Sequence, residues 1–209
     1  MKNLKTYALA TLMAGNVAAK AQNTTLDGWL ELSAGTPGKN LRLYPELNVG
    51  PVKINSLIDI NNYFQFSKTD LSTSKAQVNA GPINIKPVIT AYQDQFNGLR
   101  GMLGVNGSYF IPDKLFGFAE LSINPLDAKG DSKFYTYNGL FLPNNKGRLG
   151  LFTATPTNSI KDTYVELEAT GPSYRGIAPY GRINLQKGQK TTWQAGVSIK
   201  PKKVFNRHR

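Results

Sequence analysis

The chain has 209 residues, with 25 lysines and arginines against 13 acidic residues, for a net charge of +12. It has no cysteine, which excludes disulfides, a thiolate zinc site, a thiol nucleophile and a lipid-anchored N-terminal cysteine. The single histidine, His208, lies next to the C-terminus, so the chain cannot assemble a Ser-His-acid triad or a histidine-rich metal site. We therefore predict no cofactor, no bound metal and no enzymatic activity.

Residues 1–21 have the pattern of a signal peptide. Lys2 and Lys5 form a basic start, residues 7–18 a short apolar stretch, and Ala19-Lys20-Ala21 a cleavage site before Gln22. We expect the chain to be exported, which separates it from nucleic acid, and it carries no nucleic-acid-reading motif. After cleavage, 22 basic residues remain against 13 acidic ones, a net charge of +9.

Prolines recur along the rest of the chain at intervals of 29 to 31 residues. The series is Pro51, Pro82, Pro112, Pro143, Pro172 and Pro201. An interval of about 30 residues is the length of one hairpin, with two strands of about 10 residues and two connections. Residues 22–201 are therefore predicted to form six hairpins, or about twelve strands, followed by a basic tail at 202–209.

A second set of turn-forming segments lies roughly midway between these prolines. The segments are rich in Gly, Pro, Asn, Asp, Ser and Thr. They are residues 36–40, 67–75, 94–98, 125–132, 155–159 and 186–190. We expect the proline turns to be short and to share one rim of the fold, with longer loops at the other rim. This asymmetry is typical of transmembrane β-barrels.

Between the turns, apolar and polar residues alternate with a period of two. Residues 41–49 place Leu and Val on one face and Arg, Glu and Asn on the other, and residues 164–169 and 192–199 repeat the pattern. The chain is thus predicted to be all-β, an antiparallel up-and-down barrel. Pro45, Pro87 and Pro179 fall inside these strands, where we expect bulges because proline donates no hydrogen bond.

With these features the chain resembles the bacterial outer-membrane β-barrel class. Its last strand is similar to the assembly signal of that class, which Gln194, Gly196 and Ile199 match, although Pro201 stands where the class has a terminal aromatic residue. The resemblance implies an outer-membrane location and contact with membrane lipid. The excess lysines at both rims are then expected either to keep the loops soluble or to contact anionic lipid headgroups.

If the barrel lies in a membrane, its polar face lines the interior. The candidate lumen or pore residues are Arg42, Glu46, Lys53, Asp59, Lys86, Glu120, Glu166, Glu168 and Arg182. Asp27 and Glu31 share that face, which gives seven acidic residues against four basic ones. Two interpretations remain open: an ion-pair network that stiffens a filled barrel, or a narrow aqueous passage for small solutes or ions that favours cations.

The same alternation also fits a different class of protein. If the apolar face turned inward, the chain would be a secreted or periplasmic soluble β-barrel or β-sandwich that binds a ligand or partner. A period of two does not distinguish these arrangements, because it does not say which face meets water.

Overall fold

The computed structural model describes residues 24–36, 38–61, 65–94, 98–126, 132–156 and 159–200. The predicted signal peptide, the segment 202–209 and Pro201 lie outside the described residues. In the described part of the chain, no helix is long and apolar enough to cross a membrane.

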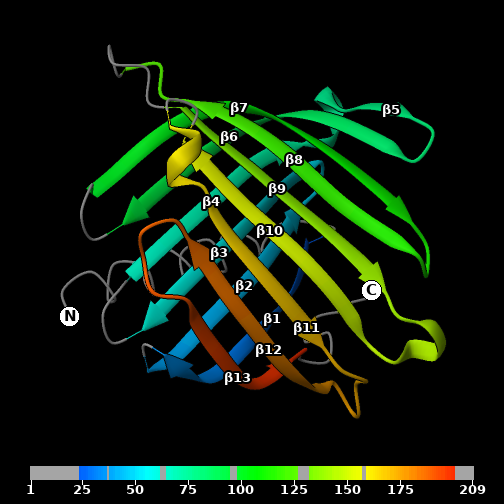
Figure 1. The fold of residues 1–209 in the computed structure, drawn as a ribbon. Helices are drawn as coiled ribbons and strands as arrows, with labels where there is room; N and C mark the ends of the chain where they lie inside the picture. The colour runs from blue at the N-terminus through cyan, green and yellow to red at the C-terminus, as the bar shows by residue number, and fades with distance from the viewer. Residues whose placement is uncertain are drawn as a thin grey trace.

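Thirteen strands form one antiparallel sheet (Figure 1). In chain order they are β1 (Thr24–Thr36), β2 (Lys39–Val49), β3 (Val52–Asn61), β4 (Gln65–Thr73), β5 (Val78–Ala80), β6 (Ile83–Asp94), β7 (Gly98–Ile111), β8 (Leu115–Ile123), β9 (Ser132–Phe141), β10 (Arg148–Pro156), β11 (Tyr164–Thr170), β12 (Ile177–Gln186) and β13 (Thr192–Ile199). Short 3₁₀ turns connect some of them: η1 (Ser74–Ala76), η2 (Pro143–Asn145) and η3 (Ile160–Asp162).

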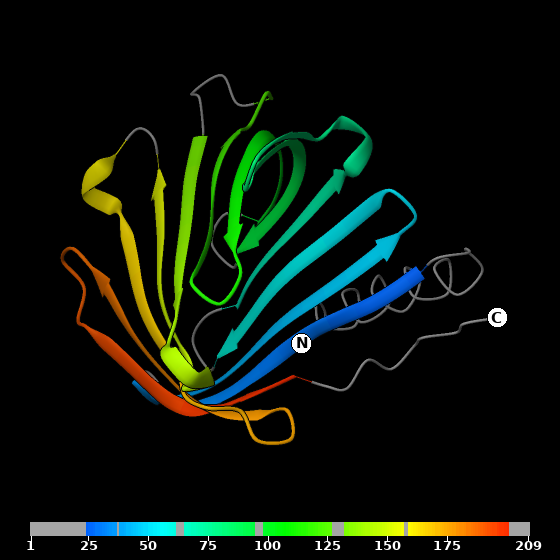
Figure 2. The same cartoon turned by 90° about the vertical axis from the view of Figure 1, so that its right-hand side faces the viewer.

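The sheet closes on itself into a barrel of twelve strands. Strand β13 pairs with β1, from Leu30 opposite Ile199 to Thr36 opposite Trp193, and the red and blue strands lie side by side in Figures 1 and 2. On the other side of β1, each strand pairs with the next in the chain, and β4 pairs with β6. Strand β5 pairs only with the first residues of β6, so it is an addition at one end of the wall. The predicted all-β, up-and-down barrel of about twelve strands is confirmed.

Leucine, isoleucine, valine and phenylalanine side chains cover the outside of the barrel, and charged side chains fill its inside. Along β8, Ala119, Leu121 and Ile123 are exposed while Glu120 and Ser122 are buried. This is the reverse of a soluble protein, in which charged residues are almost never fully buried and apolar ones usually are. A closed wall leaves no unpaired strand edge, and an apolar outer face matches hydrocarbon, so the fold is that of a transmembrane β-barrel.

The five recurring prolines among the described residues, from Pro51 to Pro172, lie at the turns of one rim, which we call the turn rim. Its connections are residues 50–51, 74–82, 112–114, 142–147 and 171–176. Gly50 and Gly81 precede two of the prolines and have φ angles of 56° and 59°, a left-handed conformation that suits glycine. The predicted position of the proline turns is therefore confirmed.

The prediction that connections at one rim are short and those at the other rim are longer is wrong. The opposite rim, which we call the loop rim, has connections at residues 37–38, 62–64, 95–97, 124–131, 157–163 and 187–191. Three of these are only two or three residues long, whereas the turn rim includes the nine residues from 74 to 82. Composition marks a turn but does not fix its length, because two-residue and eight-residue connections use the same amino acids.

One predicted loop is a strand. Residues 67–75 were assigned to a loop for their Ser, Thr, Asp and Lys content, but β4 covers most of them. Lys68 and Ser72 are buried inside the barrel, and Leu71 between them is exposed outside. Because the inner face of this barrel is polar, a strand rich in such residues has the composition of a loop.

Each internal proline lies where its strand lacks a partner on one side, and none requires an inserted residue. In β6, Pro87 falls between Ile85, the last residue paired with β5, and Val88, the first paired with β4. In β2, Pro45 lies in a short break of the pairing with β3, and Pro179 lies one residue beyond the end of the pairing between β11 and β12. The missing N–H of proline therefore costs no ladder hydrogen bond. The expected bulges are replaced by a gap of two residues on each strand at Pro45, by the change of partner at Pro87 and by the end of the pairing at Pro179.

Candidate functional site: the lumenal belt

Buried inward-facing side chains from eleven of the twelve barrel strands form a set that we call the lumenal belt. Its members are Glu31, Arg42, Asp59, Lys68, Thr90, Met102, Glu120, Tyr135, Glu166, Arg182 and Gln194. Glu31 and Glu120 are 1% exposed and Arg182 is 4% exposed. Side chains so enclosed point into the interior, so the belt narrows the lumen where it lies.

Arg42 connects strands that are far apart around the barrel. Its guanidinium on β2 donates to Asp59 on the neighbouring strand β3 at 2.5 and 2.8 Å. It also donates to both carboxylate oxygens of Glu166, at 2.6 and 3.0 Å. Glu166 lies on β11, and β1, β13 and β12 separate that strand from β2 along the shorter way around the wall. The Arg42–Glu166 pair therefore crosses the lumen instead of following the wall.

Arg182 reinforces this crossing from β12. Its Nη1 atom lies 3.5 Å from carboxylate oxygens of both Asp59 and Glu166, and its Nε donates to Gln194 at 2.6 Å. Tyr164 donates a further hydrogen bond to Glu166 at 2.7 Å. Two guanidiniums thus meet two carboxylates with no surplus charge, as buried ions require. We call Arg42, Asp59, Glu166 and Arg182 the four-ion bridge.

A second crossing joins β4 to β8. Lys68 donates to Glu120 at 2.9 Å and to Asp70 at 2.5 Å, and its ammonium lies 5.2 Å from the centre of the Tyr135 ring on β9. Glu120 also accepts hydrogen bonds from Ser122 at 2.7 Å and Thr90 at 3.3 Å. Lys68 and Ser122 are the nearest of these donors, and they hold the carboxylate in place within the lumen.

The structure places the nine predicted lumen residues in several groups. Arg42, Asp59, Glu166 and Arg182 come together in the four-ion bridge, and Glu120 belongs to the second crossing. Glu168 pairs with Arg148 at 2.6 Å. Glu46 and Lys53 form a separate pair at 2.9 Å, with both side chains about one-third exposed, and Lys86 is half-buried.

The sequence interpretation missed several lumenal groups. Lys68 and Asp70 were assigned to a loop, and Arg148 begins a strand directly after a turn. Tyr137, which donates to Glu168 at 2.5 Å, was not expected on the inner face either. The alternation of Lys68, Asp70 and Ser72 with Leu71 is a period-two signal that could have identified the strand.

Two proposed members of the assembly signal have structural roles in the barrel. Gln194 is buried in the belt, where its side-chain oxygen accepts from Arg182, Ser33 and Asn40. A Cβ atom on Gly196 would lie 1.9 Å from the carbonyl oxygen of Leu32, so glycine is required where β13 meets β1. That Gln194, Gly196 and Ile199 also act as an assembly signal stays a prediction.

Glycines on the inner face make room for aromatic rings from the adjacent strand. The Phe116 ring on β8 lies over Gly139 on β9, where an added Cβ would be 2.2 Å from the ring. On the next pair of strands, the Tyr137 hydroxyl lies over Gly150 and reaches Glu168 beyond it. The two glycines thus allow side chains to lie flat along the wall and contact residues two strands away.

Replacement of Gly150 by alanine is expected to destabilise the barrel by about 1–3 kcal/mol. The new Cβ would lie 2.4 Å from the Tyr137 hydroxyl and 2.8 Å from Cγ of Glu168, so the Tyr137–Glu168 hydrogen bond must break or shift. Urea unfolding of the protein in lipid vesicles measures this loss. Gly101→Ala is the matched control, because no atom lies within 4 Å of its added Cβ; equal losses in the two variants would contradict the packing described here.

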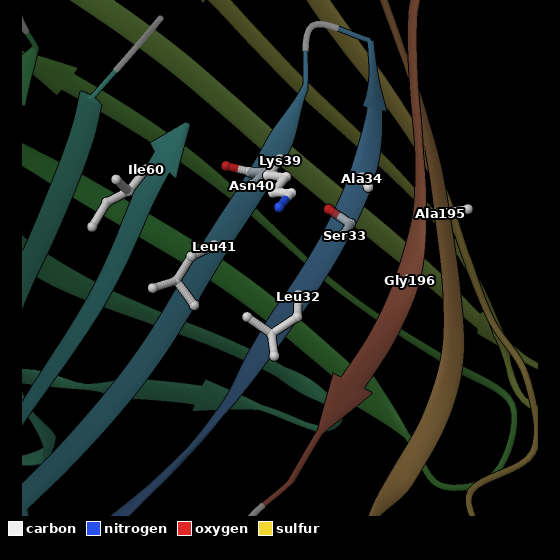
Figure 3. Close-up of a pocket in the computed structure, with 9 residues that line it drawn as sticks. All are labelled: Leu32, Ser33, Ala34, Lys39, Asn40, Leu41, Ile60, Ala195 and Gly196. Carbon is white, nitrogen blue, oxygen red and sulfur yellow. The ribbon is translucent and has the colours of Figure 1, made fainter. Parts of the chain in front are cut away.

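A shallow pocket on the outer wall is distinct from the belt. It is lined by residues of β1, β2, β3 and β13: Leu32, Ser33, Ala34, Lys39, Asn40, Leu41, Ile60, Ala195 and Gly196 (Figure 3). Leu32, Leu41 and Ile60 belong to the apolar outer face, and Lys39 is its one ionisable residue. We attribute no chemistry to it.

Comparison with known proteins shows the fold. No family model and no curated protein matches the chain. Among solved structures, the chain is similar to the KdgM porin, with a TM-score of 0.59 and 11% identity over 83% of this chain and 98% of that one. A structure of the KdgM porin in complex with disordered oligogalacturonate gives a TM-score of 0.54 at 11% identity, over 84% and 98% of the two chains. A variant of the Rh. blastica porin gives a TM-score of 0.50 at 9% sequence identity, over 85% of this chain and all of that one. The chain therefore has the β-barrel fold of outer-membrane porins.

Proposed function

We propose that this protein is an outer-membrane channel for small hydrophilic solutes or ions, with the lumenal belt as its constriction. The observation that carries the proposal is the inversion of the barrel, with ion pairs enclosed by a wall whose outer face is apolar. A polar lumen inside a closed membrane barrel is the arrangement that conducts water and solutes in porins. The KdgM porin has been solved with oligogalacturonate, and the similarity in fold supports a hydrophilic solute without naming it.

The belt explains why the channel is expected to be narrow. Twelve strands lie between eight-stranded barrels, which side chains fill, and the sixteen-stranded porins, which leave an open channel. Here the four-ion bridge and the Lys68–Glu120 pair cross the interior. Solutes therefore pass beside or between these side chains, and the bridge limits the rate.

Removal of the four-ion bridge is expected to raise the conductance several-fold. The variant combines Arg42→Ala, Asp59→Ala, Glu166→Ala and Arg182→Ala, which removes two positive and two negative charges and leaves no buried ion from the bridge. Planar bilayer recordings compare it with the wild-type protein. Glu46→Ala with Lys53→Ala is the control, because it removes one ion pair that is about one-third exposed and lies outside the belt, and it should change the conductance little. Absence of conductance in wild type and four-site variant alike would indicate a filled barrel with a structural or surface-interaction role.

We expect only a weak preference for cations. The sequence pattern placed seven acidic and four basic residues on the inner face, but the structure adds Lys68 and Arg148 against one further carboxylate, Asp70. The acidic surplus is therefore smaller, and most of these charges are paired. Lipid contact by the rim lysines remains part of the proposal, since a basic rim is attracted to anionic headgroups.

We also propose export with cleavage between Ala21 and Gln22, because the basic start and the Ala19-Lys20-Ala21 site precede the first strand. N-terminal sequencing of protein extracted from the outer membrane should begin at Gln22. A mature chain that still begins at Met1 would remove this support for an outer-membrane location.

A further inference from the structure

A cluster of phenylalanines interrupts the polar inner face near the turn rim. Its members, which we call the entrance patch, are Phe110 on β7, Phe116 and Phe118 on β8, and Phe141 on β9. The rings of Phe116 and Phe141 have centroids 5.0 Å apart, and those of Phe110 and Phe141 are 6.4 Å apart. All four share the inward face with Met102, Glu120 and Tyr135, because the period of two runs unbroken along these strands.

Packing alone does not account for the entrance patch. Phe110 is 57% exposed, although it faces the lumen and not the lipid. The other three rings of the patch are half-buried. A cluster of partly exposed apolar rings in water carries a free-energy cost and commonly marks a binding site. The barrel wall surrounds this face, so neither the bilayer nor a folded protein can cover it, and a small solute in the lumen can.

A guanidinium lies at the edge of the patch. Arg148 is centred 5.7 Å from the Phe116 ring and 6.0 Å from the Tyr137 ring. Its Nη2 atom donates to Glu168, while its buried Nε has no hydrogen-bond partner. The Arg148 side chain is 24% exposed, so part of its guanidinium is accessible beside the aromatic rings.

The surrounding turn-rim region is basic. Among the described residues in or within four residues of its connections or of the strand ends at this rim, eight are cationic and five are acidic. The cations are Lys53, Lys75, Lys86, Lys114, Lys146, Arg148, Arg175 and Lys200, and the acids are Asp27, Glu46, Asp70, Asp113 and Glu168. A mouth with a surplus of one sign raises the local concentration of solutes of the opposite sign.

We propose that the entrance patch and Arg148 form a binding site for small carboxylates that carry an aromatic ring, at the turn-rim mouth of the lumen. The ring of the solute packs on Phe110, Phe116 and Phe141, and its carboxylate lies toward Arg148. The solute enters through the proposed channel mouth, so the inference rests on the lumen being open to solvent at this end, but not on conduction through the belt. Aromatic contacts of this kind should make a benzoate bind roughly three- to tenfold more tightly than a carboxylate without a ring.

Fluorine NMR of the detergent-folded protein tests this site directly. The probes are 4-fluorobenzoate, trifluoroacetate, which has the charge without the ring, and 4-fluorobenzyl alcohol, which has the ring without the charge. We expect selective line broadening of 4-fluorobenzoate. The broadening should be lost in Phe110→Ser and retained in Phe110→Tyr, which keeps the ring. Arg148→Gln should weaken it, whereas Arg175→Gln, the same change of charge on the same rim, should not.

Several results would overturn the proposal. One is equal broadening of the 4-fluorobenzyl alcohol and 4-fluorobenzoate signals. Another is broadening of the 4-fluorobenzoate signal that persists in the Phe110→Ser variant, once heat-modifiable gel migration has shown that this variant is folded. Glucuronate is a carboxylate with a sugar ring instead of an aromatic ring. If it displaced 4-fluorobenzoate at equal concentration, the site would not select aromatic carboxylates, and the proposal would be wrong. Conductance without selective broadening of 4-fluorobenzoate would refute the entrance site and leave the proposed channel function in place. Selective broadening without conductance would support the entrance site and contradict the proposed channel function.

Discussion

Arg42→Met is expected to lower the free energy of unfolding by about 3–5 kcal/mol. The substitution keeps an unbranched apolar stem but removes the guanidinium charge that Asp59 and Glu166 share. Both carboxylates are buried, and Arg182 reaches each of them only at 3.5 Å, so they lose their main partner in a low-dielectric surround. Urea unfolding and refolding in lipid vesicles measures the change.

A charge-neutral variant separates the loss of the pair from the loss of packing. Arg42→Met combined with Glu166→Gln removes one charge of each sign and leaves the Asp59–Arg182 pair in place, so most of the lost stability should return. Arg175→Met, at an exposed turn position, should change the stability by less than about 0.5 kcal/mol. If Arg42→Met behaved like Arg175→Met, the cross-lumen pairs would contribute nothing to folding.

Val197→Arg is expected to destabilise the membrane-inserted protein by about 2–4 kcal/mol. Val197 lies on the outer face of β13 opposite Leu32, four residues before the end of β1. An arginine at that position would have to enter the hydrocarbon or bend toward a headgroup. The measurement is again urea unfolding in vesicles.

Ser198→Arg is the matched control, since it adds the same charge one residue further along on the inner face. Ser198 lies opposite Glu31, whose carboxylate can attract the new guanidinium. Its cost should therefore be much smaller than that of Val197→Arg. A larger cost at Ser198 would mean that the apolar face is the protein interior and that the barrel is soluble.

Much of the fold could be predicted from the sequence because two local signals agree. The period of two from Leu41 to Val49 identifies strands, and the proline interval sets the length of each hairpin. Together they predict the number of strands and their order, since neighbours in an up-and-down barrel are neighbours in the chain. They do not predict that Pro87 marks the change of partner from β5 to β4, because that depends on how β6 pairs with two segments at once.

The belt could be predicted only as a set of residue types on one face. The inward positions of Arg42, Asp59 and Glu166 follow from the alternation in their strands. Their contact does not, because it depends on the curvature of the wall, which brings β2 and β11 within reach across the lumen. Lys68 was missed for a different reason: a polar inner face makes β4 as hydrophilic as a loop, so composition alone misassigned it.

The inward orientation of the entrance patch could not be predicted from the residue types of its members. Phe116 and Phe118 alternate correctly with Gly117, yet their apolar character suggests an outward face. The structure places them inward because Glu120 and Ser122, further along the same strand, fix the parity. Only the continuous register with β7 and β9 decides which face the rings occupy.

The two tryptophans of the chain allow a direct test of the inverted barrel. Trp193 is 55% exposed on the outer face of β13, whereas Trp29 on β1 faces inward, stacks on Tyr44 at 4.3 Å and donates to Glu31 at 3.2 Å. Fluorescence of the single-tryptophan variants Trp29→Phe and Trp193→Phe is measured in vesicles that contain brominated phospholipids. In the Trp29→Phe variant, which retains Trp193, quenching should be strong. In the Trp193→Phe variant, which retains Trp29, quenching should be weak. Strong quenching of Trp29 with protection of Trp193, or no quenching of either, would contradict a membrane barrel with an apolar exterior and a charged lumen.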